Sequence, residues 1–330
     1  MRTVAIVGAT GAVGRELIQL LERRNFPVKE LRLFASKDSQ GRMIPFRGEM
    51  TGVSGVNEDS FRGVDIVLCS AGSDVARKLA PIAVSHGAVF IDNSSAFRMD
   101  NKVPLVIPEI NAEDIGWHSG IIANPNCTTA ITLMALYPLH QQFYARRIFA
   151  SSYQSVSGSG SKGKAELEFQ LLQIAKNVPV ERKLYPHQIA FNVIPQIGNF
   201  LDSGYTEEEM KMQDESRKIM HAAHFRASVT CVRVPVYRAH SIAVAAEFED
   251  PVNLQVAQEI LRKAPGLNYM DDPKNSVYPT PLSVSELERC AVGRLRIDNA
   301  LHNGLSFWVS GDQLLKGAAQ NAIQIAELLK

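Results

Sequence analysis

Cys127 is the residue of this chain best placed to act as a nucleophile. It lies in the segment NPNCTT (residues 124–129), directly before an apolar run with helical spacing. A thiol in the first turn of a helix faces unpaired backbone N–H groups and the positive end of the helix dipole, and both favour the reactive thiolate. Cys127 is therefore a candidate for covalent catalysis through sulfur. The alternative is a small core residue, because free cysteines are commonly buried and inert.

A glycine-rich segment near the N-terminus predicts a nucleotide-binding loop. An apolar run at residues 3–7 is followed by GATGAVG (residues 8–14) and then by a helical pattern. Gly8 permits a tight turn, Gly11 lets the backbone approach a pyrophosphate, and Gly14 lets the helix pack against the strand. A generic turn is the alternative reading of these glycines. Together with Cys127, the loop suggests an enzyme that holds an acyl group on sulfur while a nicotinamide exchanges hydride with it.

The segment after the second predicted strand favours NADP over NAD. Folds that bind NAD usually place Asp or Glu here, where it bonds the ribose 2′-hydroxyl. This chain instead offers two hydroxyls and two cations that can hold a 2′-phosphate, at Ser36, Lys37, Ser39 and Arg42. Asp38 in the same segment keeps NAD open, and a solvated polar loop is the competing interpretation.

Three other segments carry residues that suit a cofactor or a substrate. The Gly/Ser-rich segment 154–163 follows a strand-like run, so its backbone N–H groups can face a phosphate, or it is a flexible connector. Arg233 can bind a carboxylate through two parallel hydrogen bonds, and His240 titrates near neutral pH and can act as an acid or a base. Arg98 follows a predicted strand, where wound sheets collect ligands, although a surface arginine is the competing view.

The elements that must position these residues predict an α/β fold. At 330 residues the chain is too long for one ordinary core, so we expect two domains. Helical patterns separate several buried-strand candidates, which favours a parallel sheet wound by βαβ units. Those candidates are residues 3–7, 31–35, 64–70, 88–92 and 105–107. The later part predicts an α+β domain with strands at 148–156, 229–236 and 241–248 and helices at 165–175, 252–263 and 312–329.

Composition excludes several classes of function. The 35 basic and 34 acidic residues leave a net charge of +1, so no global field recruits nucleic acid or an anionic membrane. The apolar runs are far shorter than a membrane span, and the chain enters a strand at once, so we expect no signal peptide. Four widely separated cysteines without metal-ligand spacing argue against both a disulfide scaffold and a zinc site. We therefore expect a cytoplasmic protein without a metal.

These segments resemble the aspartate-β-semialdehyde dehydrogenase family, and the similarity extends over essentially the whole chain. None of the matching stretches would suffice alone, but together they are highly specific. They are GATGAVG (8–14), DNSSAFRMD (92–100), NPNCTT (124–129), YQSVSGSG (153–160), FNVIPQIG (191–198), EEEMKMQDESRKI (207–219), RVPVYRAHS (233–241), VGRLRID (292–298) and DQLLKGAA (312–319).

The resemblance implies catalytic and substrate-binding roles for eight residues. The catalytic residues are the nucleophile Cys127, the general acid/base His240 and Gln154, which positions the reacting group. Arg233 clamps the substrate carboxylate and Glu208 meets its amino group. The phosphate that enters or leaves is held by Arg98, Asn126 and Lys211.

The resemblance also implies the residues that bind the cofactor, NADP or NADPH. They are Gly8, Thr10, Gly11, Ala12 and Val13 in the first loop, Ser36, Lys37 and Ser39 beside the 2′-phosphate, Ser157 and Gly158 in the second loop, and Gln313 beside the nicotinamide. Two places depart from the family pattern. Residues 237–239 before His240 are Tyr-Arg-Ala where many relatives have a small residue, and Gln313 stands where some relatives have Asn.

The implied reaction is the NADPH-dependent conversion of L-4-aspartyl phosphate to L-aspartate 4-semialdehyde and phosphate, through a thioester on Cys127. It serves the biosynthesis of lysine, threonine and methionine. The implied domains are an NADP-binding Rossmann-type domain (residues 1–127 and 311–330) and an α+β catalytic and dimerisation domain (128–310) that forms a homodimer. Two alternatives stay open: an N-acetyl-γ-glutamyl-phosphate reductase, and a non-catalytic dinucleotide-binding paralogue.

Overall fold

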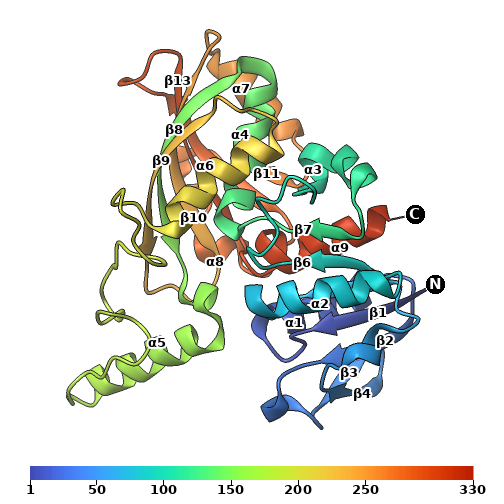
Figure 1. Cartoon of the computed structure of the whole chain (residues 1–330). Coiled ribbons are helices and arrows are strands. Elements are labelled where there is room, and N and C mark those ends of the chain that lie inside the picture. Colours follow the sequence, from blue (N-terminus) through green and yellow to red (C-terminus); the bar gives the residue numbers. More distant parts are fainter. Residues whose placement is uncertain (330) are drawn as a thin grey trace. The chain divides into compact units, whose positions relative to one another are not determined.

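The computed structural model describes residues 1–329 and divides into two compact units (Figure 1). The first unit contains Met1–Asn126 and the C-terminal segment that begins at Gly317. The second unit contains Cys127–Lys316. The boundary therefore falls at the peptide bond directly before the candidate nucleophile.

The first unit is built on a seven-stranded sheet with the order β3-β4-β2-β1-β5-β6-β7. Its strands are β1 (Arg2–Val7), β2 (Val28–Phe34), β3 (Met43–Phe46), β4 (Glu49–Ser54), β5 (Ile66–Cys69), β6 (Val89–Asp92) and β7 (Ile121–Ala123). All neighbours are parallel except the hairpin of β3 and β4. The central strand β1 is apolar on both faces, as an interior strand of a parallel sheet must be, and residues 4–7 are all buried. The prediction of a wound parallel sheet is confirmed.

Helices of the first unit are α1 (Ala12–Arg23), α2 (Ser73–Ser85), α3 (Pro108–Asn111) and α9 (Gln320–Leu328). The predicted helix at 312–329 begins instead with a π-helical segment, Leu315–Ala319, that leads into α9, and α9 packs against α1 and β6. The strand expected at 105–107 is wrong. Only Leu105 forms a bridge, to Ala123, because Pro104 and Pro108 restrict the backbone on both sides. Strand β7 occupies that place in the sheet.

The second unit is built on a six-stranded mixed sheet with the order β11-β12-β13-β10-β8-β9. Its strands are β8 (Ala145–Gln154), β9 (Arg226–Arg233), β10 (His240–Phe248), β11 (Leu267–Tyr269), β12 (Cys290–Ile297) and β13 (Gly304–Gly311). Helices α4 (Cys127–Phe143), α6 (Glu207–Ile219) and α7 (Leu254–Lys263) pack on one face of the sheet, while α5 (Gly160–Ala175) extends away from it (Figure 1). The short α8 (Pro281–Val284) contacts β13. The expected α+β architecture is confirmed.

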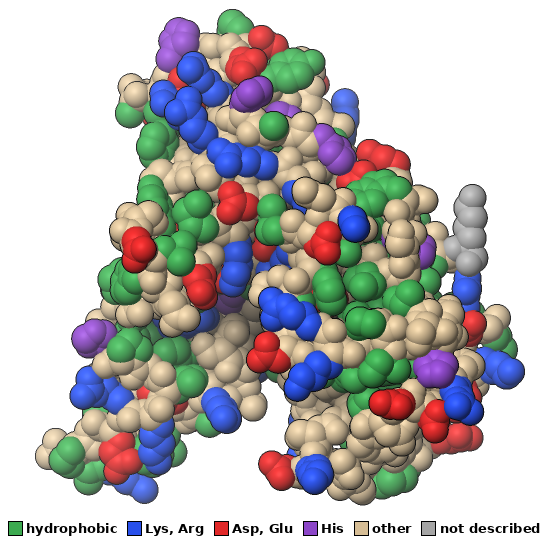
Figure 2. All heavy atoms as spheres, viewed as in Figure 1, with side chains coloured by type: hydrophobic (Ala, Val, Ile, Leu, Met, Phe, Trp, Pro, Cys, Tyr) green, Lys and Arg blue, Asp and Glu red, His purple; other side chains and the backbone are tan. Residues whose placement is uncertain are grey.

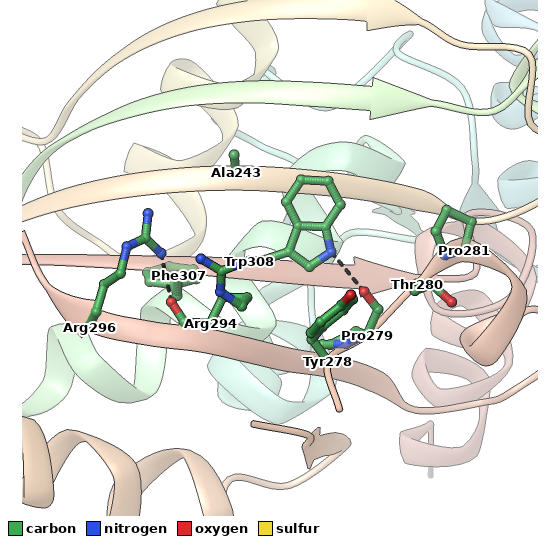
Figure 3. Close-up of a pocket in the computed structure, with 9 residues that line it drawn as sticks. All are labelled: Ala243, Tyr278, Pro279, Thr280, Pro281, Arg294, Arg296, Phe307 and Trp308. Carbon is green, nitrogen blue, oxygen red and sulfur yellow. Dashed lines mark hydrogen bonds between the residues drawn. The ribbon is translucent and has the colours of Figure 1, made fainter. Parts of the chain in front are cut away.

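The face of this sheet opposite α4 and α6 carries exposed aromatic side chains. Strand register places Phe149 beside Ala245 and Ala243 beside Trp308, and the Tyr153 and Trp308 rings lie 5.3 Å apart. A pocket of about 300 Å³ opens here, and Figure 3 shows the indole of Trp308 at its centre, with two arginines on one side and Tyr278 and Pro279 on the other. The second unit thus has one helix-covered face and one face with apolar residues in contact with solvent.

The visible surface mixes basic and acidic side chains without a dominant sign, in agreement with the net charge of +1 (Figure 2). Among residues 1–329, no helix is long and apolar enough to span a membrane.

Candidate active site

The glycine loop of the first unit is shaped by backbone contacts that exclude side chains. Gly8 has a φ of +88°, and a Cβ atom there would lie 2.4 Å from the carbonyl oxygen of Ser70. A Cβ at Gly14 would lie 2.2 Å from the carbonyl oxygen of Gly8. Gly11 caps α1 without a side chain, so the first N–H groups of this helix are left for a ligand. Only glycines allow this close turn, which fits a dinucleotide phosphate cradle.

The polar segment after β2 lies beside this loop. Thr10 Oγ1 donates a hydrogen bond to the buried Ser39 Oγ at 3.2 Å, which ties the glycine loop to the segment predicted to bind the 2′-phosphate. Ser36 and Lys37 are exposed there. A pocket of about 520 Å³ runs from Thr10 along α1 and β3.

Three exposed arginines line this pocket, and none of them forms an ion pair among the described residues. They are Arg42, which the sequence had indicated, and Arg15 and Arg47, which it had not. Arg15 Nε donates to the carbonyl oxygen of Thr10 at 3.3 Å. The sequence could have indicated Arg15, because it follows the last glycine of the loop directly, in the first turn of the predicted helix.

Arg98 is held inside the first unit rather than on its surface. It is buried, its Nε donates to the carbonyl oxygen of Asn124 at 2.9 Å, and its Nη2 donates to the carbonyl oxygen of Asn93 at 3.0 Å. Two of its guanidinium nitrogens therefore fix the backbone just before the NPNCTT segment. Asn126, one residue before the unit boundary, is also buried.

A group of buried asparagines, which sequence reasoning missed, supports the same backbone. Asn124 Nδ2 donates to Asn93 Oδ1 at 3.0 Å and to the carbonyl oxygen of Ala318 at 3.2 Å. Asn321 Nδ2 donates to Asn124 Oδ1 at 2.7 Å and to the carbonyl oxygen of Val106 at 2.8 Å. These bonds join the ends of β6 and β7 to the C-terminal helix.

Cys127 is the first residue of α4 and the least buried of the four cysteines. Its Sγ lies 3.9 Å from Thr128 Oγ1. The other three cysteines are buried, and burial raises the pKa of Cys69 and Cys231 to about 12, so both are neutral thiols at neutral pH. The predicted location at a helix N-terminus is what the structure has, and Cys127 is the thiol that an electrophile can reach.

Gln154, the last residue of β8, connects α4, the helix that begins at Cys127, to α6. Its Nε2 donates to Thr128 Oγ1 at 2.8 Å and to Glu208 Oε1 at 3.4 Å, and its Oε1 accepts from Ser152 Oγ at 3.2 Å. Glu208 also pairs with Lys211 one turn along α6, with Oε2 and Nζ 2.9 Å apart. Three of the predicted site residues are thus in one hydrogen-bonded group next to Cys127.

Arg233 and His240 come from the end of β9 and the start of β10, and both are buried. Arg233 Nη1 donates to the carbonyl oxygen of Ser155 at 2.7 Å, and no other side-chain bond of Arg233 is found among the described residues. His240 Nδ1 accepts from the Ser155 backbone N–H at 3.0 Å. Burial, together with the nearby Arg233 charge, lowers the pKa of His240 to about 3, so the imidazole is neutral.

Gly158 lies directly against both of these side chains. A Cβ atom at this position would be 2.8 Å from Arg233 Nη1 and 3.2 Å from His240 Nε2. The buried Nε2 of His240 has no hydrogen-bond partner among the described residues. The absence of a side chain at residue 158 therefore leaves a space beside an unpaired ring nitrogen and a guanidinium.

Gln313 is buried behind this space, where its amide bonds within the protein. Its Oε1 accepts from the Ala239 backbone N–H at 2.8 Å, and its Nε2 donates to Ser157 Oγ. The neighbouring Asp312 accepts from Arg238 Nε and from the Glu286 backbone N–H. The Asp312–Gln313 pair thus fixes residues 238–239, which lead into His240.

The structure distributes the predicted site residues between the two units. The second unit holds Cys127, Gln154, Ser157, Gly158, Glu208, Lys211, Arg233, His240 and Gln313. The first unit holds the glycine loop with Ala12 and Val13, the segment with Ser36, Lys37 and Ser39, and Arg98 and Asn126. Each group is chemically coherent: phosphate-binding features in the first unit, and a thiol with acid/base and ion-binding groups in the second.

Comparisons with known proteins find the same two-part organisation. A family model described as semialdehyde dehydrogenase, NAD binding domain, matches residues 3–118, and one described as semialdehyde dehydrogenase, dimerisation domain, matches residues 136–316. The aspartate-semialdehyde dehydrogenase of Aquifex aeolicus is 47% identical, with 99% of this chain and 97% of the relative covered. That of Bacillus subtilis is 45% identical with the same coverage, 99% and 97%.

Solved structures of aspartate semialdehyde dehydrogenases also match this chain over its whole length. The crystal structure of aspartate semialdehyde dehydrogenase II from Vibrio cholerae is 43% identical and superposes with a TM-score of 0.97, covering 100% of this chain and 98% of that one. A second structure of the Vibrio cholerae enzyme, complexed with ASA, is 42% identical, with a TM-score of 0.97 and the same coverage.

Proposed function

The chain belongs to the aspartate-semialdehyde dehydrogenase family, and from this premise we propose that it catalyses the NADPH-dependent reductive dephosphorylation of L-4-aspartyl phosphate. The products are L-aspartate 4-semialdehyde and phosphate, the reaction is reversible, and it serves the biosynthesis of lysine, threonine and methionine. The observation that carries the proposal is the accessible Cys127 at the N-terminus of α4, in the same unit as Gln154, Glu208, Arg233 and His240.

The first step proposed is acyl transfer to sulfur. The Cys127 thiolate, stabilised by the N-terminus of α4, attacks the acyl carbon of aspartyl phosphate. A carbon–sulfur bond forms, the bond from carbon to the phosphate oxygen breaks, and phosphate leaves with the electron pair. The product is a thioester on Cys127. Gln154 is anchored to Thr128 next to the sulfur and holds the reacting group in place.

NADPH, when bound, supplies the hydride that reduces this thioester. The oxygen on the resulting tetrahedral carbon is negatively charged. His240 acts as the acid and base at that oxygen. Collapse breaks the carbon–sulfur bond, releases the aldehyde and regenerates the Cys127 thiolate.

The charged residues of the second unit fit the two ends of an amino-acid substrate. Among residues 1–329, Arg233 uses only one of its N–H groups in a side-chain hydrogen bond, so others are left for the carboxylate. Glu208, partly buried and beside Lys211, provides the negative charge for the amino group. We assign the phosphate to Lys211, Arg98 and Asn126. The ASA complex of the Vibrio cholerae relative supports a substrate of this chemical class.

The cofactor assignment follows from the first unit, which we propose as the NADP-binding domain, with the second unit as the catalytic and dimerisation domain. The cradle in which a Cβ at Gly8 or Gly14 would clash fits a pyrophosphate. Ser36, Lys37 and Ser39 would hold the 2′-phosphate, and Arg15 and Arg42 add two positive charges beside Thr10. On the other unit, Ser157, Gly158 and Gln313 would face the nicotinamide end.

An assay in both directions tests the proposal. The purified protein is given aspartate semialdehyde, phosphate and NADP, and in separate reactions aspartyl phosphate or N-acetyl-γ-glutamyl phosphate with NADPH. We expect turnover with the aspartyl compounds and loss of turnover in Cys127→Ala, with a trapped thioester detectable by mass spectrometry in the wild type alone. Turnover of the acetylated glutamyl compound alone would establish the rival reductase. Wild-type turnover in Cys127→Ala would show that the thiol is not the nucleophile.

A further inference from the structure

A chain of buried hydrogen bonds runs from the backbone before His240, through three side chains, back to the His240 ring. Gln313 Oε1 accepts from the Ala239 N–H at 2.8 Å, and Gln313 Nε2 donates to Ser157 Oγ. Ser157 Oγ lies 3.0 Å from Ser155 Oγ, which lies 3.1 Å from His240 Nδ1. All five residues are buried. We call the side chains of Gln313, Ser157 and Ser155 the serine relay.

The direction of every proton in the serine relay is set by its fixed donors. The Ala239 backbone N–H can only donate, so the Gln313 oxygen faces Ala239 and the amide NH₂ faces Ser157. Ser157 Oγ accepts a hydrogen bond from this NH₂ group, and its own hydroxyl donates a hydrogen bond to Ser155 Oγ. Ser155 in turn donates to His240 Nδ1, on the same side as its own backbone N–H.

The backbone N–H of Ser155 requires an unprotonated Nδ1. A hydrogen on Nδ1 would face this N–H at a nitrogen–nitrogen distance of 3.0 Å and would leave the N–H without its acceptor. A neutral imidazole must then carry its hydrogen on Nε2. That nitrogen is buried and has no partner among the described residues, and it faces the space that Gly158 leaves.

We propose that the serine relay holds His240 as the neutral Nε2–H tautomer, so that the ring donates a hydrogen bond to the oxygen of the reacting acyl group and does not serve as the base that ionises Cys127. Ser155 and Ser157 are then positioning residues. The inference rests on the proposed function, because it assigns His240 to the oxygen of the acyl group and not to the Cys127 thiol. The Cys127 thiolate is stabilised by the N-terminus of α4 instead.

The charges around His240 agree with a ring that stays neutral. Arg233, from β9, lowers the pKa of His240, and Glu208, from α6, opposes it with a smaller effect, while burial is the largest influence and also lowers the pKa. A ring in these surroundings is a poor acceptor for a thiol proton at neutral pH. It remains a good hydrogen-bond donor, which is what a developing oxyanion requires.

The first test observes the tautomer without any turnover. Nitrogen-15 NMR of histidine-labelled wild-type protein, with His240→Asn to assign the signal, should show hydrogen on Nε2 and none on Nδ1 from pH 5.5 to 8.5. In Ser155→Ala and Ser157→Ala the signal should shift or split between tautomers. Ser159, in the same loop, has no side-chain hydrogen bond to any of residues 1–329, so Ser159→Ala is the matched control and should leave the signal unchanged. A wild-type ring with hydrogen on Nδ1 overturns the inference.

The second test separates the two possible roles of His240. The rate of Cys127 alkylation by iodoacetamide is measured against pH in the wild type, His240→Asn and Ser157→Ala. We expect similar alkylation profiles in all three, while kcat falls at least about tenfold in Ser157→Ala and about 10²-fold in His240→Asn. Alkylation that slows in step with kcat would identify His240 as the base and overturn the inference.

Two further measurements keep the outcome clear. Ser157→Thr keeps a hydroxyl at the same position and should recover kcat relative to Ser157→Ala, and thermal unfolding midpoints identify any variant that fails to fold. Wild-type kcat in Ser157→Ala would remove the serine relay from the mechanism. The tautomer can be observed even if aspartate semialdehyde is not turned over, so failure of the proposed function and failure of this inference give different results.

Discussion

At the scale of single residues, Arg233 combines deep burial with guanidinium N–H groups that bond to none of the described residues. Replacing it with leucine should lower kcat/KM about 10²-fold, because a charged contact to the substrate carboxylate contributes about 3 kcal/mol. Arg226→Leu, at the exposed start of the same strand, is the matched control and should leave kcat/KM unchanged. Unchanged kinetics in Arg233→Leu would remove the carboxylate clamp from the model of the site.

A substitution at Gly158 tests whether the substrate occupies the space beside His240. In Gly158→Ala the new methyl group would lie 2.8 Å from Arg233 Nη1 and 3.2 Å from His240 Nε2, so it should lower kcat/KM at least about tenfold. The thermal midpoint should change little, because Gly158 is exposed and its backbone φ lies outside the left-handed range that disfavours alanine. Gly116→Ala, where a methyl group meets open space, is the control for the substitution itself. Normal kinetics in Gly158→Ala would mean that substrate does not occupy this space.

The low pKa of His240 makes a prediction about stability against pH. Burial lowers it from 6.5 in the unfolded chain to about 3 in the folded protein, so folding favours the neutral ring. This contribution is complete above pH 6.5 and is lost as the pH falls toward 3, at about 1.4 kcal/mol per pH unit.

The free energy of unfolding from urea titrations between pH 7.5 and 5 should therefore decrease more steeply in the wild type than in His240→Asn. The difference between the two proteins isolates the histidine from all carboxylates. Parallel curves would show that the ring titrates normally in the folded state.

At the scale of elements, the N-terminus of α6 determines where Glu208 lies. Thr206 caps the helix in a reciprocal capping box with Glu209, and both side chains are buried. Thr206→Ala should cost about 1 kcal/mol of stability and should also raise KM, because the first turn that carries Glu208 loosens. Asn253→Ala, at the N-cap of α7, should lose similar stability without a change in KM. Equal KM values in the two variants would show that the Thr206 cap does not position Glu208 for substrate binding.

The sequence predicted the elements whose pattern is local and missed those that depend on neighbours. Strand β1 was recognisable because it is apolar on both faces, and α4 because its helical spacing begins at Cys127. Strand β7 was missed because three apolar residues among loops carry no period. Strands β3 and β4, at one end of the first sheet, were missed because their exposed positions are mixed in polarity.

The site shows the same division. Cys127, Arg233 and His240 were predictable as residue types in favourable segments, and their resemblance to a family supplied roles that stay predictions. The serine relay was not predictable, because Ser155 and Ser157 read as a loop open to phosphate, and only the fold buries their hydroxyls between His240 and Gln313. Likewise, Asn124 and Asn321 are far apart in sequence and meet only after the chain has folded.

At the scale of the whole molecule, the uncovered face of the second sheet predicts a homodimer. Phe149, Tyr153 and Trp308 share this face, and burying them against a second copy removes apolar surface from water. Sedimentation of the wild type should give a dimer, and Phe149→Glu should shift the equilibrium toward the monomer. Met50→Glu, an exposed apolar position in the first unit, is the control. A monomeric wild type, or a fully dimeric Phe149→Glu, would contradict an interface on this face.

The unit boundary at the bond between Asn126 and Cys127 has an evolutionary consequence. Every side chain proposed to touch the sulfur is inherited with the second unit, whereas the groups proposed to discriminate between coenzymes are inherited with the first. Laboratory selection for an enzyme that uses NAD in place of NADP should therefore give substitutions before residue 126. The neighbourhood of the thiol can then be left untouched while coenzyme preference is rewritten.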